Sequence, residues 1–351
     1  MRKVYFILSF LLFICVLHAC KKDNNPSEVY TPVSYAIQVP DFVNVFAGAP
    51  VIPADNPTTV SGVSLGRKLF YETMLSNDLT MNCASCHKQA NSFDDSRQFS
   101  QGTPGTFGTR NAMPIVNMAW NNSFFWDGRR PSLEGQAHDP VANPIEMANS
   151  WPVVVTRLQQ SATYPELFFK AFGTRVIDSN LVVKAIAQFE RTLVSFNSRY
   201  DQYAYLHNPV LTSDEADGYE LFQVFHCTSC HSYGLFTDHS FRNNGLDLVP
   251  ADSGLAKFTH NPADYGKFKV PSLRNVALTA PYMHDGRFAT LDAVVNFYSR
   301  FVSAGSPNLD SNMNLILNGP AMTPTQRGHI VAFLMTLTDS SFITNAAYSQ
   351  P

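Results

Sequence analysis

Apolar residues recur at helical spacing in several stretches of this 351-residue chain. The first predicted helix has its apolar residues on one face, at Val63, Leu65, Leu69 and Phe70. Further helices are predicted over four ranges, 151–171, 180–199, 290–301 and 324–338. Thr323 and Pro324 favour the start of the last one, as N-cap and first helical residue. Because no stretch alternates polar and apolar residues convincingly, we expect a mainly helical protein with long loops.

A weak internal repeat divides the chain into two similar units. Gly-x-x-Leu-Phe occurs at 66–70 and again at 218–222, and each copy runs toward a Cys-x-x-Cys-His motif. Thr212 and Glu215 form a possible capping box before the second copy. The repeat predicts an N-terminal domain over 59–206 and a C-terminal domain over 207–351.

The N-terminus has the pattern of an export signal. Met1, Arg2 and Lys3 precede a short apolar run that ends near Cys20, which resembles the lipobox of bacterial lipoproteins. We expect 1–19 to be a signal peptide, Cys20 to carry the lipid, and 20–58 to be a flexible tether rich in Pro, Asn, Ser and Thr. A transmembrane anchor is the alternative, but the run is shorter than the roughly 20 residues a span needs. The expected location is the periplasm, tethered to the outer membrane, although Lys21 leaves the choice of membrane open.

The charge of the chain argues against nucleic acid as a partner. The formal net charge is -3 and charged residues make up 15% of the chain, so no basic surface is indicated.

The cysteines outside the N-terminal segment fall into two Cys-x-x-Cys-His motifs. Their residues are Cys83, Cys86 and His87, and Cys227, Cys230 and His231. In such a motif the two thiols bind the vinyl groups of a haem and the histidine ligates the iron. A zinc or dithiol redox site is the alternative, because two cysteines and a histidine also suit zinc. The histidine present in both motifs favours two covalent c-type haems, with His87 and His231 as iron ligands.

Several segments around these motifs resemble the bacterial di-haem cytochrome c peroxidase and MauG family. The similar segments are Leu65–Phe70, Arg110–Pro114, Phe125–Arg129, Leu273–Gly286 and the final helix. The resemblance implies two cytochrome c-like haem domains packed together. It also implies that the His87 haem reacts with peroxide and that the His231 haem receives electrons.

The resemblance further assigns three residues to catalysis. Gln136 and Glu146 match the glutamine and glutamate on the distal side of the peroxide haem, where a carboxylate can move a proton between the peroxide oxygens. Trp126 matches a tryptophan that carries charge between the haems. From composition alone, Glu146 would be an exposed loop residue and Trp126 a core residue.

A calcium site between the domains is also implied. Asn111, Thr279 and Pro281 match the positions that bind this ion through one side-chain oxygen and two backbone carbonyls. Oxygen ligands suit calcium, and water would complete the shell.

Two positions depart from the typical peroxidases of the family. No histidine occurs between His87 and His138, and the loop 99–110 has none to block the peroxide haem. The methionine that ligates the second haem in those peroxidases is replaced by Tyr298, as in MauG. Met283 is the alternative ligand, and Tyr298 is otherwise a core residue facing the haem.

The expected function is reduction of hydrogen peroxide with electrons from a small periplasmic donor such as cytochrome c. Two alternatives remain, a MauG-like enzyme that uses peroxide to oxidise a partner protein, and a non-enzymatic electron carrier. The family also suggests a homodimer.

Overall fold

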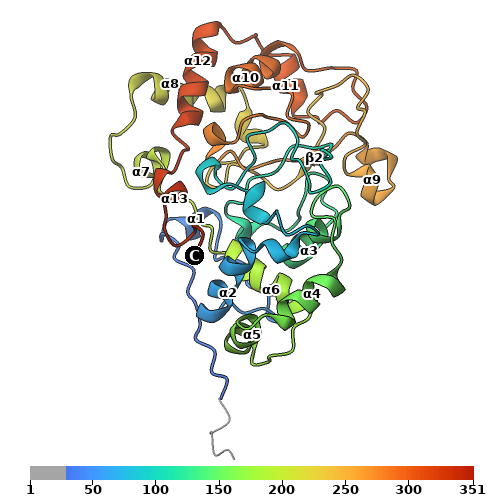
Figure 1. Cartoon of the computed structure of the whole chain (residues 1–351). Helices are drawn as coiled ribbons and strands as arrows, with labels where there is room; N and C mark the ends of the chain where they lie inside the picture. The colour runs from blue at the N-terminus through green and yellow to red at the C-terminus, as the bar shows by residue number, and fades with distance from the viewer. Residues whose placement is uncertain (1–28) are drawn as a thin grey trace, which may run out of the picture.

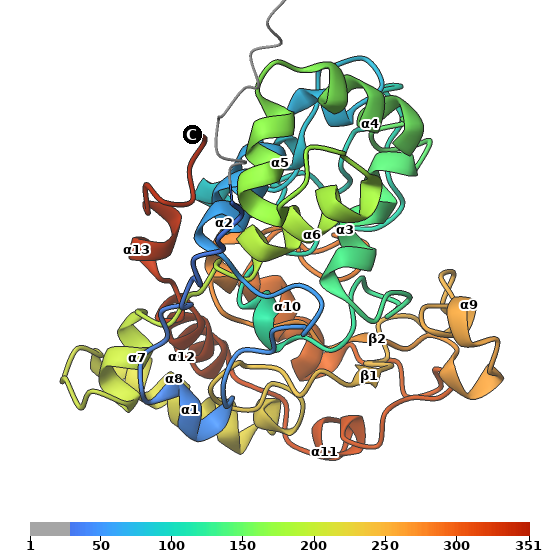
Figure 2. The same ribbon diagram turned by 90° about the horizontal axis from the view of Figure 1, so that it is seen from below.

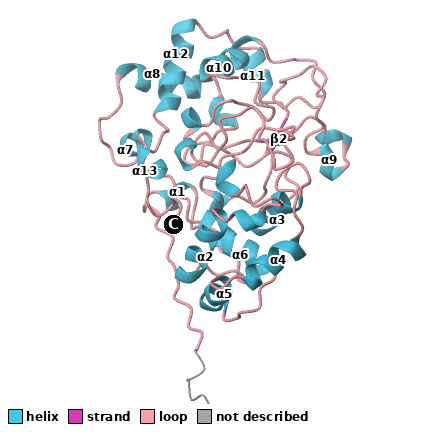
Figure 3. Ribbon diagram, viewed as in Figure 1, coloured by secondary structure: helices cyan, strands magenta, loops and turns pink. Residues whose placement is uncertain are grey.

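The computed structural model describes residues 29–351, and most of its regular structure is helical (Figures 1 and 3). Long loops connect the helices, and the only sheet in the described residues pairs β1 (Phe241–Arg242) with β2 (Phe268–Lys269). The prediction of a mainly helical fold is confirmed. Within 29–351, no helix is both long and apolar enough to span a membrane.

Helices of the N-terminal half surround the first hydrophobic core. They are α2 (Val60–Phe70), α3 (Leu133–Ala142), α4 (Trp151–Gln160), α5 (Tyr164–Phe172) and α6 (Ser179–Glu190). Helices α2 and α6 pack so closely that a Cβ on Gly66 would overlap the carbonyl of Ala185. Glycine at this position therefore permits the contact between the two helices.

The C-terminal half contains the helices α7 (Arg199–Ala204), α8 (Ser213–Val224), α9 (Ala256–Thr259), α10 (Leu291–Arg300), α11 (Met313–Leu317), α12 (Pro324–Met335) and α13 (Ser340–Ile343). Of these, α7, α8, α10 and α12 contribute buried residues to a second core. Gly218 on α8 meets the carbonyl of His329 on α12 in the same way that Gly66 meets Ala185. The repeated Gly-x-x-Leu-Phe segment thus forms the same helix contact in both halves.

Helix starts were predicted better than helix lengths. The capping box of Thr212 and Glu215 is present, and Thr323 caps α12 with Pro324 in its first turn. The helix predicted over 151–171 is two helices, because the chain turns at Ser161 and Pro165 opens α5. The helix predicted over 180–199 ends at Glu190.

Residues 29–58 pack against the body instead of forming part of a flexible tether. The hydroxyl of Tyr30 donates to the carbonyl of Ala171 on α5, and Val43 in α1 (Val43–Phe46) is fully buried. The amide of Asn56 donates to Glu134 on α3. These contacts correct the expected tether over this range. The signal segment 1–19, Cys20 and the residues up to 28 lie outside the described residues.

The two halves exchange segments at their boundary. Tyr200 on α7 packs in the second core, although it precedes the expected boundary at 206–207. In the opposite direction, Phe342 on α13 joins the first core, and Arg67 on α2 donates to the carbonyls of Ala346 and Ser349. Figure 2 shows α13 and the C-terminus on the side of α2. The last residues of the chain therefore hold the C-terminal half against the N-terminal half.

Candidate haem sites

Each Cys-x-x-Cys-His motif folds as one tight turn. The first cysteine opens a short 3₁₀ helix in both motifs, η2 (Cys83–Ser85) and η5 (Cys227–Ser229). The backbone N–H of His87 donates to the carbonyl of Cys83 at 2.9 Å, and that of His231 donates to Cys227 at the same distance. The two motifs thus present their thiols and imidazoles in equivalent arrangements.

Both imidazoles are oriented by a backbone carbonyl. Nδ1 of His87 lies 2.8 Å from the carbonyl oxygen of Phe93, and Nδ1 of His231 lies 3.1 Å from that of Phe236. Because a carbonyl only accepts, Nδ1 carries the proton and Nε2 is left to bind a metal. Burial lowers the pKa of both histidines, which favours the neutral form that ligates iron.

These residues fit haem better than zinc. All four thiols are free of disulfides, as covalent attachment of haem requires. Within residues 29–351, no group of three or more His, Cys, Asp or Glu side chains is placed to hold a metal ion, whereas structural zinc takes four such ligands. A haem needs only the two cysteines and the histidine from each turn.

Glu146 lies near the first motif in a half-buried position. Nδ2 of Asn143 donates to its Oε1 at 2.6 Å. Burial raises the pKa of the Cys86 thiol, and the negative charge of Glu146 acts in the same direction. Burial raises the pKa of Glu146, while the Asn143 hydrogen bond and Arg129 act against this shift. A carboxyl with a raised pKa is suited to exchange a proton near neutral pH.

Gln136 belongs to the helix that precedes Glu146. It is half-buried on α3, which Ser132 caps by accepting from the backbone N–H of Gly135. The C-terminal turn of α3 holds the Glu146 segment directly, because the backbone N–H of Met147 donates to the carbonyl of Pro140 at 3.2 Å. The structure therefore places Gln136 and Glu146 on two connected segments.

The loop 99–110 is attached to the Glu146 backbone. The N–H of Thr103 donates to the carbonyl of Glu146 at 2.8 Å, and its hydroxyl donates to the same oxygen at 3.2 Å. Gly102 lies so close to the carbonyls of Ile145 and Glu146 that a Cβ would overlap them. The loop that carries no histidine is thus held in place by Thr103 and Gly102.

Trp126 lies where the two halves meet. Its indole N–H donates to the carbonyl of Asn111 at 2.9 Å, and its own carbonyl accepts from the backbone N–H of Lys269 on β2. The guanidinium of Arg110 forms an ion pair with the carboxylate of the adjacent Asp127 at 2.6 Å. It forms a second ion pair, at 2.7 Å, with Asp252 of the C-terminal half. These contacts fix Trp126 between segments of both domains.

The three residues expected to bind calcium lie on two paired segments. The backbone N–H of Asn111 donates to the carbonyl of His284, three residues beyond Pro281. The amide nitrogen of Asn111 donates to the carbonyls of Arg97 and Gln98, so its oxygen is the atom able to ligate. Thr279 is buried in the same region.

Tyr298 and Met283 both contact Asn244. The amide nitrogen of Asn244 donates to the Tyr298 hydroxyl at 2.9 Å and lies 3.8 Å from the Met283 sulfur. Burial raises the pKa of Tyr298 to about 12, and the thiols of Cys230 and Cys227 act in the same direction. Both candidate ligands therefore lie on the side of the second motif.

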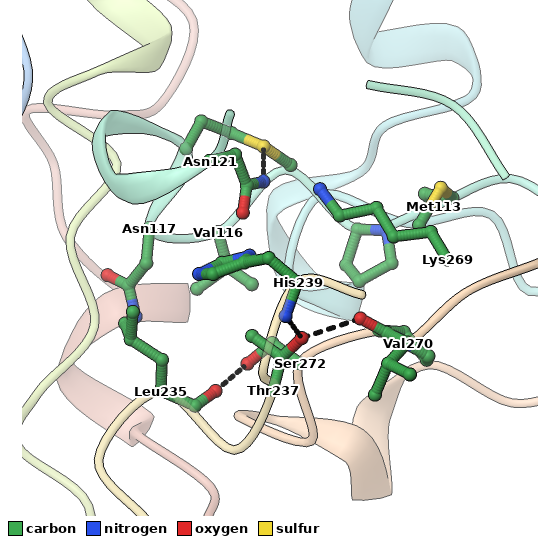
Figure 4. A pocket seen from close by; sticks show the side chains of 13 residues that line it. Met113, Val116, Asn117, Asn121, Leu235, Thr237, His239, Lys269, Val270 and Ser272 are labelled. Carbon is green, nitrogen blue, oxygen red and sulfur yellow. Dashed lines mark hydrogen bonds between the residues drawn. The ribbon is translucent and has the colours of Figure 1, made fainter. Parts of the chain in front are cut away.

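A pocket between the halves contains two unusual basic groups (Figure 4). Lys269 is 5% exposed, and its ammonium donates to the carbonyl of Ser123. Burial lowers the pKa of Lys269 to about 8 and that of His239, whose Nδ1 is buried without a partner, to about 4. The ammonium of Lys269 would suit an anionic group of a bound haem.

Comparison with known proteins decides the family. The model for the di-haem cytochrome c peroxidase matches residues 60–208. MauG of Methylorubrum extorquens is 36% identical over 81% of this chain and 80% of that protein. Cytochrome c551 peroxidase of Nitrosomonas europaea is 34% identical over 83% of this chain and 85% of that protein. The chain belongs to the di-haem cytochrome c peroxidase and MauG family.

A solved structure supports this assignment over the whole fold. A MauG-like protein associated with microbial copper homeostasis superposes with a TM-score of 0.81 and 34% identity, covering 91% of this chain and 99% of that one. Membership of this di-haem family supports haem cofactors at the two motifs. Relatives carry the names of both peroxidases and MauG, so membership alone does not select one reaction.

Two residues next to the expected site were missed from the sequence. Asn143 and Asn244 donate to Glu146 and Tyr298. Asn143 lies three residues before Glu146 in a turn, so local spacing is a signal that would have identified it. Asn244 lies 54 positions before Tyr298, and nothing in the sequence pattern connects the two.

Proposed function

We propose that this protein reduces hydrogen peroxide to water with electrons from a small donor protein of the cytochrome c kind. The observation that carries the proposal is Glu146, a half-buried residue whose pKa is raised by burial, whose carboxyl accepts a hydrogen bond from Asn143, and whose backbone carbonyl holds the loop 99–110 through Thr103. An electron carrier would have no use for a carboxyl tuned in this way beside its haem.

The reaction consumes one peroxide, two electrons and two protons and yields two water molecules. The haem held by His87 supplies the iron at which peroxide is reduced. Glu146 takes a proton from one peroxide oxygen and returns it to the other, which becomes the leaving water. Gln136 orients the peroxide by hydrogen bonding from α3.

Access to this haem does not require release of a histidine. The loop 99–110 contains none, and Thr103 is hydrogen-bonded to the Glu146 carbonyl. We expect the purified ferric protein to contain one high-spin and one low-spin haem. Two low-spin haems in an electron paramagnetic resonance (EPR) spectrum would contradict the open site.

Trp126 is the residue proposed to carry charge between the two haems. It bridges the halves through Asn111 on one side and Lys269 on the other. Trp126→Phe should therefore slow electron delivery from the His231 haem without changing the binding of peroxide.

Glu146→Gln tests the catalytic role directly. In the holoprotein, removal of a general acid-base should lower the rate of peroxide consumption by about 10²–10⁴-fold. Glu166→Gln is the matched control. Glu166 is an exposed carboxyl on α5, outside the proposed site, and it is paired with Arg175. Peroxide consumption at the parental rate in Glu146→Gln would contradict the mechanism and favour the electron carrier.

A MauG-like reaction is the second candidate, and Tyr298 favours it. Its hydroxyl is buried beside Asn244 near the second motif. A phenolate ligand would stabilise the ferric state and make storage of electrons as reduced haem less favourable. Slow oxidation of a cytochrome donor, together with a long-lived species of higher oxidation state, would support oxidation of a partner protein instead.

Calcium is proposed to bind at Asn111, Thr279 and Pro281. The Asn111 oxygen and two carbonyls supply hard ligands, and water would complete the shell. Titration of the chelator-treated holoprotein with calcium should show one site by calorimetry. Asn111→Leu should abolish that binding.

Export to the periplasm and attachment to the outer membrane through Cys20 are also proposed. The charged start, the apolar run and the small residue before Cys20 support a lipoprotein signal. Labelled palmitate should be incorporated into the parental protein and not into Cys20→Ala.

A further inference from the structure

Five tyrosines form a continuous group of rings in the C-terminal half, and Tyr203 joins it through Tyr219 at 6.3 Å. We call Tyr200, Tyr203, Tyr205, Tyr219 and Tyr233 the tyrosine cluster. Tyr200 lies at its centre, with ring centroids 5.9 Å from Tyr205, 5.8 Å from Tyr219 and 6.3 Å from Tyr233. Tyr219 and Tyr233 are also adjacent, at 5.3 Å. Every member is therefore in contact with at least one other phenol ring.

One end of the cluster reaches the second haem motif. Tyr233 follows His231 by two residues, and Tyr219 and Tyr233 pack with Cys227 around the second core. A haem attached through Cys227 would thus have the tyrosine cluster among its nearest aromatic neighbours.

The other end reaches the surface beside α1 and α7. The Tyr205 ring is half-exposed and stacks on Phe42 at 4.6 Å with an interplanar angle of 8°. The next residue, Leu206, is 52% exposed. Figure 2 shows α1 lying against α7 and α8 on this side of the molecule. The cluster therefore connects the environment of Cys227 with solvent.

Packing alone gives no reason for the hydroxyl group of Tyr233. The hydroxyl of Tyr233 is buried without a hydrogen-bond partner, which costs free energy that phenylalanine would avoid. Tyr200 is 2% exposed among Phe222, Phe236 and Phe333, which fill the same core with rings that lack an oxygen. Tyrosine differs from these phenylalanines in that its phenol can lose one electron and one proton.

We propose that the tyrosine cluster is a redox relay, in which Tyr219 and Tyr205 are oxidised in turn and pass electrons from the surface beside α7 to the haem held by His231. This inference rests on the proposed reaction with peroxide, which supplies the oxidant. It adds a point at the surface where electrons enter, which the reaction at Glu146 does not require.

The balance of the relay is two tyrosines for each peroxide. The O–O bond of the peroxide breaks and two water molecules form. The two electrons come from two tyrosine hydroxyls, each of which also releases a proton to water and becomes a neutral tyrosyl radical. A one-electron donor at the surface near Tyr205 then restores each phenol with one electron and one proton.

The test uses the holoprotein mixed with one equivalent of hydrogen peroxide in the absence of a donor. Samples frozen within milliseconds are measured by EPR, in protein grown with ordinary and with ring-deuterated tyrosine. We expect a radical signal that narrows on deuteration. Tyr205→Phe together with Tyr219→Phe should reduce it at least fivefold, because the phenylalanine rings keep the packing but cannot form the radical.

Tyr265→Phe is the matched control. Its hydroxyl donates to the backbone carbonyl of Pro250, and it lies in the loop after α9 outside the cluster. This variant should keep the full signal.

The outcomes separate the relay from the reaction that feeds it. If the haem absorption changes on addition of peroxide but no tyrosyl signal forms, or if the double variant keeps the parental signal, the relay is wrong and the peroxidase proposal stands. If the haem absorption does not change, both proposals fall together.

Discussion

The amide nitrogen of Asn244 donates a hydrogen bond to the hydroxyl of Tyr298 at 2.9 Å and lies 3.8 Å from the sulfur of Met283. One amide thus adjoins both candidate ligands of the second haem. With Tyr298 as the ligand, Tyr298→Phe should remove the tyrosinate absorption band of the ferric protein and raise the reduction potential of that haem. Optical redox titration of the holoprotein measures both.

Met283→Leu is the matched variant for this prediction. It removes the thioether and keeps the volume, so the spectrum and potential should remain parental. A change in Met283→Leu without one in Tyr298→Phe would instead identify the methionine as the ligand.

Asn143 should set the pH at which Glu146 acts. Burial raises the pKa of Glu146, and the hydrogen bond from Asn143 opposes that rise by stabilising the carboxylate. Because the carboxylate form must accept the first proton, the rate should increase as pH rises through this pKa. Asn143→Asp removes the amide that donates to Glu146 and adds a second negative charge. The rise in the pH–rate profile should therefore move to higher pH by about one unit.

Steady-state peroxide reduction between pH 4 and pH 9 checks this shift. Asn308→Asp is the control, since Asn308 is an exposed amide that donates to the carbonyls of Pro262 and Tyr265. If the rate in Asn143→Asp rises over the same pH range as in the parental protein, Glu146 does not control that rise.

The covalent attachment of haem was readable from the sequence because it depends on neighbouring residues. Cys83, Cys86 and His87 lie within one turn, so their spacing already fixes their geometry. The equivalence of Gly66 and Gly218 was visible as a repeat, and the structure explains it by a helix carbonyl at each glycine.

Contacts between distant segments were not readable in this way. The burial of Val43 with Ala119, Trp120 and Phe196 depends on segments far from 29–58, whose composition alone indicated a tether. The joining of Phe342 to the first core likewise depends on the path that the chain takes after α12. Periodicity reports which face of an element is buried, but not which element covers it.

Gly102 is predicted to be required for the position of Glu146. A Cβ at this residue would overlap the carbonyls of Ile145 and Glu146, so Gly102→Ala should displace this backbone and lower the rate of peroxide reduction about tenfold or more. Gly108→Ala in the same loop is the control, because a Cβ there would lie at an ordinary contact distance of 3.7 Å from the carbonyl oxygen of Arg110. Equal rates in the two variants would exclude a role for this close approach.

The strongest effect on stability is expected at the buried ion pair of Arg274 and Asp201. Two nitrogens of Arg274 donate to the two carboxylate oxygens at 2.9 and 2.8 Å, and both side chains are almost completely buried. Asp201→Asn leaves the guanidinium charge buried without its partner, which should cost about 3–5 kcal/mol of unfolding free energy. Urea unfolding of the holoprotein, followed by circular dichroism, measures this loss.

Two further variants make that measurement decisive. Glu166→Gln breaks the exposed pair with Arg175 and should change the unfolding free energy by about 0–1 kcal/mol. Replacing both partners, as Asp201→Leu with Arg274→Met, removes the uncompensated charge and should recover much of the stability lost in Asp201→Asn. If the double variant is less stable than Asp201→Asn, the buried charge is not the cause of the loss, and the hydrogen bonds from Ser198 to Asp201 account for it instead.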